Sequence, residues 1–199
     1  MHTFEELCLE NPGVLYTRLP EHLFEEIRAS IPSAVEAAVP YQNDLVGNID
    51  EEYRFPLSQN FVSFLNTMWI AYRERFDIWR DKEYHIPEFA WINLMKKGEF
   101  NPIHIHDGAA SWVLWVDIPY DLQEEIKSES AKRQDYPTAS MFQFVYSKLN
   151  GEISHLTLPI DQSWEGAMVM FPAYLKHLVY PYSTTDKQRI SIASNIALV

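Results

Sequence analysis

The segment NPIHIHDG, residues 101–108, places two histidines and an aspartate within four positions. It comes directly before the apolar run ASWVLWVDI, which is typical of a β-strand. On a strand, residues two apart project to the same side, so His104 and His106 can face one centre. Two neutral imidazoles that converge in this way form half of a metal site. Asp107 lies on the other face if the strand continues, and turns inward if the strand ends at Gly108.

A third metal ligand must come from elsewhere in the chain, and His177 in MVMFPAYLKHLVYP is the best candidate because it begins a strand-like run. Two histidines from one strand and a third from a later strand form one face of a metal site, which leaves positions open for exogenous ligands. For the remaining histidines we expect structural roles: His2, His22, His85 and His155.

The last strand-like run, RISIASNIAL, begins with Arg189, twelve residues after His177. Arg189 and Ser191 share one face of this strand, so a guanidinium and a hydroxyl point the same way. Arginine binds a carboxylate in bidentate fashion. Alone, the pair is typical of a surface salt bridge beside an exposed hydroxyl. Together with three candidate metal ligands, it indicates a carboxylate receptor.

The first part of the chain predicts helices. LPEHLFEEIRASI, residues 19–31, has Leu23, Ile27 and Ile31 at helical spacing, with Pro32 expected to interrupt the helix. The segment LSQNFVSFLNTMWIAYRERFDIW, residues 57–79, predicts a second amphipathic helix.

After about residue 88 the pattern changes to short strand-like runs: FAWINLM, SWVLWVDI, SMFQFVYS, EISHLTL, AMVMFP, HLVYP and RISIASNIAL. Asn150-Gly151 lies between two of them and favours a hairpin. The prediction is a mainly β protein of the α+β class, a sandwich or barrel with N-terminal helices packed on it. The polar segment 121–137 interrupts the strands and is predicted to be a surface excursion or a lid.

The length, the net charge and the cysteine count of the chain limit the functions that it can have. The 199 residues suffice for one domain, with 1–87 as helical support and 88–199 as the β core. The formal net charge of −12 makes nucleic acid and anionic lipid unlikely partners. The single cysteine, Cys8, excludes an intramolecular disulfide and is expected to be a small buried residue. No leader or membrane span is evident, so we expect a soluble cytoplasmic protein.

These motifs resemble those of a known family. His104 with His106, a distal histidine in FPAYLKH and an arginine in QRISIASN are similar to the pattern of the Fe(II)- and 2-oxoglutarate-dependent oxygenases. More narrowly, NPIHIHDGAASWVLWVDIPYD with FPAYLKHLVYPY resembles oxygenases frequent in bacteriophages of marine bacteria. The resemblance covers residues 88–199; in the helical part, LVGNIDEEY is the closest phrase.

The resemblance implies a double-stranded β-helix, a jelly roll of cupin-like architecture. It implies His104 and His177 as ligands of Fe(II), and Arg189 with Ser191 as the site for the far carboxylate of 2-oxoglutarate. The family's usual pattern has an acid two residues after the first histidine, where this chain has His106. Either His106 completes a face of three histidines, as strand geometry favours, or Asp107 swings in as the alternative second ligand.

The function implied is a dioxygenase that hydroxylates an unidentified small molecule or peptide, with release of succinate and CO2. Tyr174, Trp115 and Asn93 are candidates to line its cavity. A cupin-like metal-binding jelly roll with other chemistry is one alternative, and a non-enzymatic structural or binding jelly roll is a second. The sequence leaves the oligomeric state open.

Overall fold

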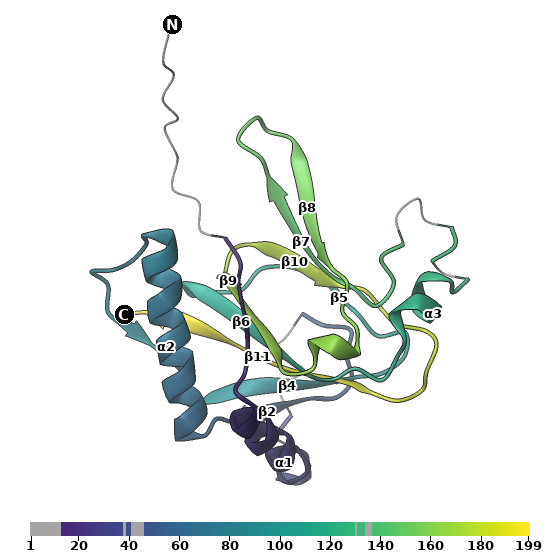
Figure 1. The fold of residues 1–199 in the computed structure, drawn as a ribbon, viewed down its shortest axis with the longest axis horizontal. Helices are drawn as coiled ribbons and strands as arrows, with labels where there is room; N and C mark the ends of the chain where they lie inside the picture. The colour runs from purple at the N-terminus through teal and green to yellow at the C-terminus, as the bar shows by residue number, and fades with distance from the viewer. Residues whose placement is uncertain (1–12, 38, 41–45, 130, 134–136) are drawn as a thin grey trace, which may run out of the picture.

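The computed structural model describes residues 13–37, 39–40, 46–129, 131–133 and 137–199, so Cys8 and His2 lie outside the described residues. It contains two antiparallel sheets (Figure 1). The larger has the order β1-β9-β6-β11-β4-β2, with β3 paired to β11, and the smaller has the order β5-β10-β7-β8. The strands are β1 Leu15–Arg18, β2 Glu52–Pro56, β3 Tyr84–His85, β4 Phe89–Met95, β5 Asn101–His104, β6 Ala110–Asp117, β7 Phe142–Ser147, β8 Ile153–Leu158, β9 Ala167–Pro172, β10 Lys176–Val179 and β11 Arg189–Leu198.

From β4 onward the chain alternates between the two sheets. It passes from the large sheet to β5, back to β6, across to the β7–β8 hairpin, back to β9, across to β10 and finally to β11. Apart from the β7–β8 hairpin, strands from β4 onward that are adjacent in sequence therefore lie in different sheets, and the two candidate histidine segments, β5 and β10, become neighbours in the small sheet.

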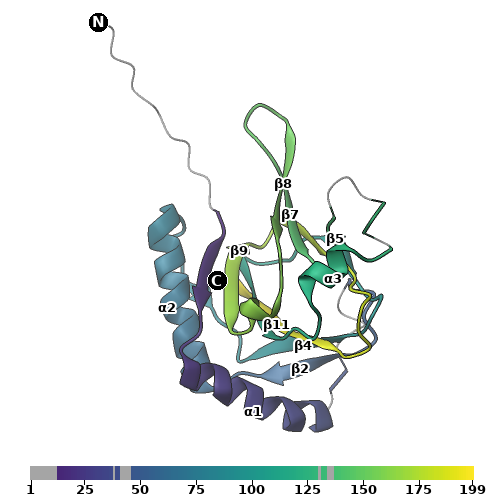
Figure 2. The same ribbon diagram turned by 45° about the vertical axis from the view of Figure 1, so that its right-hand side comes forward.

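Two helices cover the outer side of the large sheet (Figures 1 and 2): α1, Glu21–Ala37, and α2, Gln59–Phe76. Ser58 caps α2 by accepting a hydrogen bond from the backbone N–H of Phe61. The Phe61 ring meets Trp112 of β6 edge to face at 5.5 Å between centroids. The expectation that Pro32 ends the first helix was wrong, because Pro32 lies inside α1.

The predicted strands of residues 89–198 are present, and β4, β9 and β11 have the predicted limits. The hairpin at Asn150-Gly151 joins β7 to β8, and Gly151 has φ of 85°. Residues before 88 also contribute three strands to the large sheet, β1, β2 and β3. Both long helices lie before residue 88, as predicted, but the three short strands in this part were not predicted, because short strands with no clear alternation escape sequence patterns.

Alternation along the strands of the large sheet separates two cores. Ile92, Leu114 and Ile192 face the helices, whereas Val113, Trp115 and other side chains of the opposite parity face the small sheet. Polar side chains of this second set, among them Asn93, Arg189 and Ser191, line the space between the sheets. This arrangement decides which residues can form a site.

The first part of the segment predicted to be a surface excursion or a lid is packed against the body of the protein. It starts with a short helix, α3 (Leu122–Ile126), in which Glu125 is fully buried. The Glu125 carboxylate accepts hydrogen bonds from the backbone N–H groups and the hydroxyls of Ser183 and Thr184. The start of the segment is thus tied to the loop before β11, and nothing in this part has the character of a free excursion.

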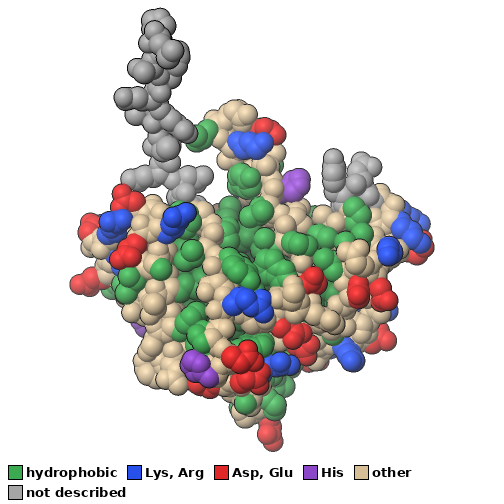
Figure 3. Space-filling view, viewed as in Figure 1, with side chains coloured by type: hydrophobic (Ala, Val, Ile, Leu, Met, Phe, Trp, Pro, Cys, Tyr) green, Lys and Arg blue, Asp and Glu red, His purple; other side chains and the backbone are tan. Residues whose placement is uncertain are grey.

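The β7–β8 hairpin projects from the body of the protein (Figure 1) and exposes Tyr146, Leu149, Ile153 and Leu156. Figure 3 shows hydrophobic side chains gathered across the middle of the same face, beneath the hairpin. No helix within the described part of the chain is long and apolar enough to cross a membrane.

Candidate metal centre and carboxylate pocket

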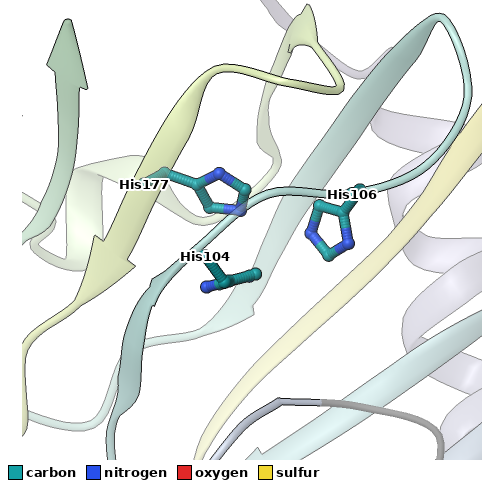
Figure 4. Close-up of side chains that lie close together, drawn as sticks. All are labelled: His104, His106 and His177. Carbon is teal, nitrogen blue, oxygen red and sulfur yellow. The ribbon is translucent and has the colours of Figure 1, made fainter.

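Three imidazole rings meet between the sheets (Figure 4). One ligand nitrogen from each of His104, His106 and His177 lies within 4.8 Å of the others. The ring centroids are 4.2 Å apart for His104 and His177, 4.9 Å for His104 and His106, and 5.0 Å for His106 and His177. These separations match three ligands arranged around one ion.

The local structure explains the convergence. His104 ends β5 and stands opposite His177 of β10 in the sheet register. His106 lies beyond the strand, and its backbone N–H donates to the carbonyl of Ala173 at 2.9 Å. The prediction that a strand carries both histidines was therefore wrong in detail, although the two rings do face one centre. Gly108 follows with φ of 107°, which allows the chain to turn into β6.

Burial keeps these three rings neutral, and hydrogen bonds orient two of them for metal binding. Burial lowers the pKa of His104, and it lowers the pKa of His106 to about 4 and that of His177 to about 3, with repulsion from His104 adding to both. The rings are thus neutral near pH 7. Nδ1 of His104 lies 2.7 Å from the carbonyl of Pro102, and Nδ1 of His177 lies 2.9 Å from that of Leu175. Each Nδ1–H donates to a carbonyl, so each Nε2 keeps its lone pair for a metal.

Asp107, the alternative second ligand, has a different position. Its side chain is exposed, and it does not belong to the group of converging ligand atoms. Strand β5 stops at His104, yet the loop carries His106 rather than Asp107 toward the centre.

Arg189 lines the same pocket between the sheets as the three histidines. It is only 4% exposed. Its guanidinium donates to the Tyr120 hydroxyl at 3.3 Å and the Ser140 carbonyl at 3.0 Å, and contacts Sδ of Met95 at 2.6 Å. Among the described residues no carboxylate pairs with it. A buried cation without an anion favours an anionic ligand, and a surface salt bridge is excluded by its burial.

Ser191 shares the inner face of β11 with Arg189, as predicted, and both line the pocket. Asn93 and Trp115 also line it, and Asn93 donates to the Ser191 hydroxyl at 3.3 Å. Tyr174 does not. It is 67% exposed in the turn after β9 and lines a different, shallow hollow, so its predicted position was wrong.

Sequence reasoning missed Glu52, which lines the same pocket from β2 and is 1% exposed. Burial, with repulsion from Glu99, raises the pKa of its carboxyl to about 7. The only signal in the sequence is an acid beside apolar residues in the run EYRF, which has no helical period. The Tyr120 hydroxyl and the Ser140 carbonyl, both bound to Arg189, were missed as well.

We expect Glu52→Gln to stabilise the protein in a pH-dependent way. A folded pKa above the ordinary value of 4.5 means that the folded state holds its proton more tightly. Its stabilising contribution is present below pH 4.5 and is lost as the pH rises through 7. At 1.36 kcal/mol per pKa unit, the gain from Glu52→Gln grows by about 2–3 kcal/mol between pH 5 and pH 8. Urea unfolding at the two pH values measures it.

The matched control is Glu51→Gln, which removes the same charge one residue away. Hydrogen bonds from Lys96 and Gln188 lower the pKa of Glu51, so its effect has the opposite sign and stability falls slightly at pH 8. Equal responses of the two variants would contradict the burial of the Glu52 carboxyl.

Comparison with known proteins agrees with this geometry. The family described as "Putative 2OG-Fe(II) oxygenase" matches residues 89–195, more than half of the chain. No curated protein matches the sequence significantly.

Solved structures of similar fold include a Pseudomonas putida prolyl-4-hydroxylase, with a TM-score of 0.57 and 13% identity over 94% of this chain and 91% of that one. A Trichoplax adhaerens prolyl hydroxylase in complex with a hypoxia-inducible-factor peptide fragment has a TM-score of 0.58 and 11% identity, covering 94% and 83% of the two chains. At these identities the likeness concerns the fold alone.

Proposed function

Since this chain belongs to the 2OG-Fe(II) oxygenase family, we propose that it is a 2-oxoglutarate-dependent dioxygenase that hydroxylates a substrate and releases succinate and CO2. The observation that carries the proposal is the presence in one pocket of three converging neutral imidazoles and a buried guanidinium with no carboxylate partner among the residues that the structure describes. We further infer that the two alternating sheets form a double-stranded β-helix, in line with the order of their strands.

The donor set fits Fe(II). Imidazole nitrogens suit iron, and three of them on one side leave other coordination positions free. His104 and His177 are oriented by their Nδ1 hydrogen bonds, and the His177 ring lies parallel to Phe142 with centroids 5.5 Å apart. Ligands fixed in this way lose little conformational entropy when they bind a metal. In this proposal His104, His106 and His177 are the ligands, and the site keeps the full double positive charge of the ion.

Arg189 fits the far carboxylate of 2-oxoglutarate, with the Ser191 hydroxyl beside it. With iron and 2-oxoglutarate bound, O2 would be the oxidant: it would take two electrons from 2-oxoglutarate, which becomes succinate and CO2, and two from the substrate C–H bond. One oxygen atom would enter succinate and the other the hydroxyl group of the product. The protein's own share is to hold the carboxylate at Arg189, to fix three imidazole ligands, and to exclude water with Trp115, Phe142 and Phe171.

The burial of Arg189 favours this proposal over a cupin-like metal site with other chemistry, which does not need a cationic anchor on its last strand. It also disfavours a purely structural jelly roll, since a buried guanidinium with no carboxylate partner among the described residues costs free energy unless it binds an anion. The narrower likeness to bacteriophage oxygenases stays a prediction from sequence.

An anaerobic titration tests the function. Fe(II) is added to metal-free protein and then 2-oxoglutarate, and the weak visible charge-transfer absorption of the chelated keto acid is recorded. We expect one Fe(II) per chain and a band that saturates with 2-oxoglutarate. Metal binding without the band would favour the cupin-like alternative, and absence of metal binding would remove the enzyme proposal.

The second ligand is tested by a pair of variants. We expect His106→Ala to weaken Fe(II) binding by two orders of magnitude or more, because one of three ligands is lost, whereas Asp107→Ala leaves it within about twofold, because Asp107 is exposed. Competition with a fluorescent chelator measures both constants. The reverse order of effects would assign the carboxylate as the ligand.

A further inference from the structure

The wall of the pocket formed by β2, β4 and β5 contains three buried oxygen atoms that accept no hydrogen bond from any described residue: Oε2 of Glu52, Oδ1 of Asn93 and Oδ1 of Asn101. All three residues line the pocket that contains the histidines and Arg189. Buried polar atoms without partners are rare in native proteins and cost free energy, so their grouping in one wall calls for a ligand.

The sheet register explains the grouping. Ser191 of β11 stands opposite Asn93 of β4, and Asn93 stands opposite Glu52 of β2. Side chains opposite each other in neighbouring strands project to the same face. The row therefore runs from Ser191, which lies beside Arg189, to Glu52 on the edge strand. One end of the pocket is cationic, while the other presents the three acceptor oxygens without partners.

The donors nearest in sequence or in space are engaged elsewhere. Lys96 pairs with Glu51 at 2.7 Å, and the amide nitrogen of Asn93 donates to Ser191. Arg189 is bound to Tyr120 and Ser140. No described cation lies within 4.0 Å of the Glu52 carboxylate. The missing partner must therefore come from outside the described residues.

We propose that Glu52, Asn93 and Asn101 bind the cationic end of the substrate, an alkylammonium or alkylguanidinium group. A group with several N–H donors satisfies all three acceptors, and its charge balances a carboxylate that is otherwise costly to bury. Trp91, two residues before Asn93 on the same face of β4, lines the pocket and offers an aromatic surface to the cation or its methylene groups. The assignment as substrate rests on the proposed oxygenase function, whereas cation binding itself does not.

Two variants test the wall in different ways. Glu52→Gln keeps the shape and removes the charge. Gly47→Ala keeps the charge, but its Cβ atom would lie 2.3 Å from Oδ1 of Asn101 and 3.3 Å from Oε1 of Glu52, so it displaces the Asn101 amide. Glu51→Gln is the control, because it removes the same charge from the outer surface and leaves the pocket unchanged.

The experiment is ligand-observed NMR with the metal-free 199-residue chain and three probes: n-butylammonium, n-butylguanidinium and the neutral butan-1-ol. We expect one or both cations to show saturation transfer and butan-1-ol to show little. Glu52→Gln should weaken cation binding at least tenfold and Gly47→Ala severalfold, while Glu51→Gln leaves it unchanged. The better of the two cations identifies the substrate group.

Equal binding in wild type and Glu52→Gln, equal binding of butan-1-ol, or no binding of either cation would overturn the inference, and water would then be the partner of these oxygens. The proposed function is tested by a different result, the 2-oxoglutarate titration. If the cations bind but the 2-oxoglutarate titration is negative, the pocket is a cation receptor and the oxygenase proposal falls; the opposite result removes this inference alone.

Discussion

His177→Ala should abolish Fe(II) binding while the protein stays folded. The imidazole of His177 is the most buried of the three, and its pKa of about 3 keeps it available as a neutral ligand. Removal leaves two ligands on different elements, β5 and the loop after it, which is insufficient for a stable site. Iron content after anaerobic loading and gel filtration should fall from about one ion per chain to nearly none.

The control for this change is His155→Ala, which removes an exposed imidazole from β8. Near-ultraviolet circular dichroism checks the fold, because the rings of Phe142 and Phe171 pack against His177 and report on local repacking. Full iron content in a folded His177→Ala protein would show that the three rings do not form the metal site.

Arg189→Met should remove 2-oxoglutarate binding and leave Fe(II) binding intact. The guanidinium is buried and unpaired by any described acid, so a bound carboxylate is its principal counter-charge. Breaking a buried charge-assisted pair costs about 2–5 kcal/mol, which corresponds to a loss of affinity of roughly 30-fold to several thousand-fold. Titration of the Fe(II)-loaded variant with 2-oxoglutarate measures this loss.

Two further variants sharpen the result. Lys187→Met removes a positive charge from an exposed side chain two residues away and should have little effect. Arg189→Lys keeps the charge but loses the bidentate geometry, so its affinity should lie between those of the wild type and Arg189→Met. Unchanged affinity in Arg189→Met would place the carboxylate elsewhere in the pocket.

Sequence patterns predicted most of the strands and the convergence of His104, His106 and His177, because alternation and the spacing of rare residue types are local properties. Helix α1 was predicted, but its length was not. A proline usually interrupts a helix, so the sequence predicted that the helix ends at Pro32. Packing of Ile31 and Ala34 against the sheet stabilises the helix beyond that point.

The acceptor wall could not be predicted in the same way. Glu52 reaches Asn93 only because two strands about 40 residues apart pair in one register, and no local pattern encodes that pairing. For Tyr174 the error was the reverse: the prediction placed in the pocket a residue that lies outside it. An aromatic residue beside a candidate ligand suggests a cavity wall, but the turn after β9 directs its side chain to solvent.

The buried Glu125 of α3 has a consequence for the timescale of motion near Arg189. Its carboxylate holds the backbone N–H groups of Ser183 and Thr184, and the Tyr182 hydroxyl donates to the carbonyls of Met95 and Lys187. Opening this loop therefore breaks the hydrogen bonds that the Ser183 and Thr184 N–H groups and hydroxyls donate to Glu125, so its amide hydrogens should exchange with solvent at rates near those of the sheets rather than those of ordinary loops. The anchor of the pocket is rigid before any ligand arrives, and binding incurs little ordering entropy there.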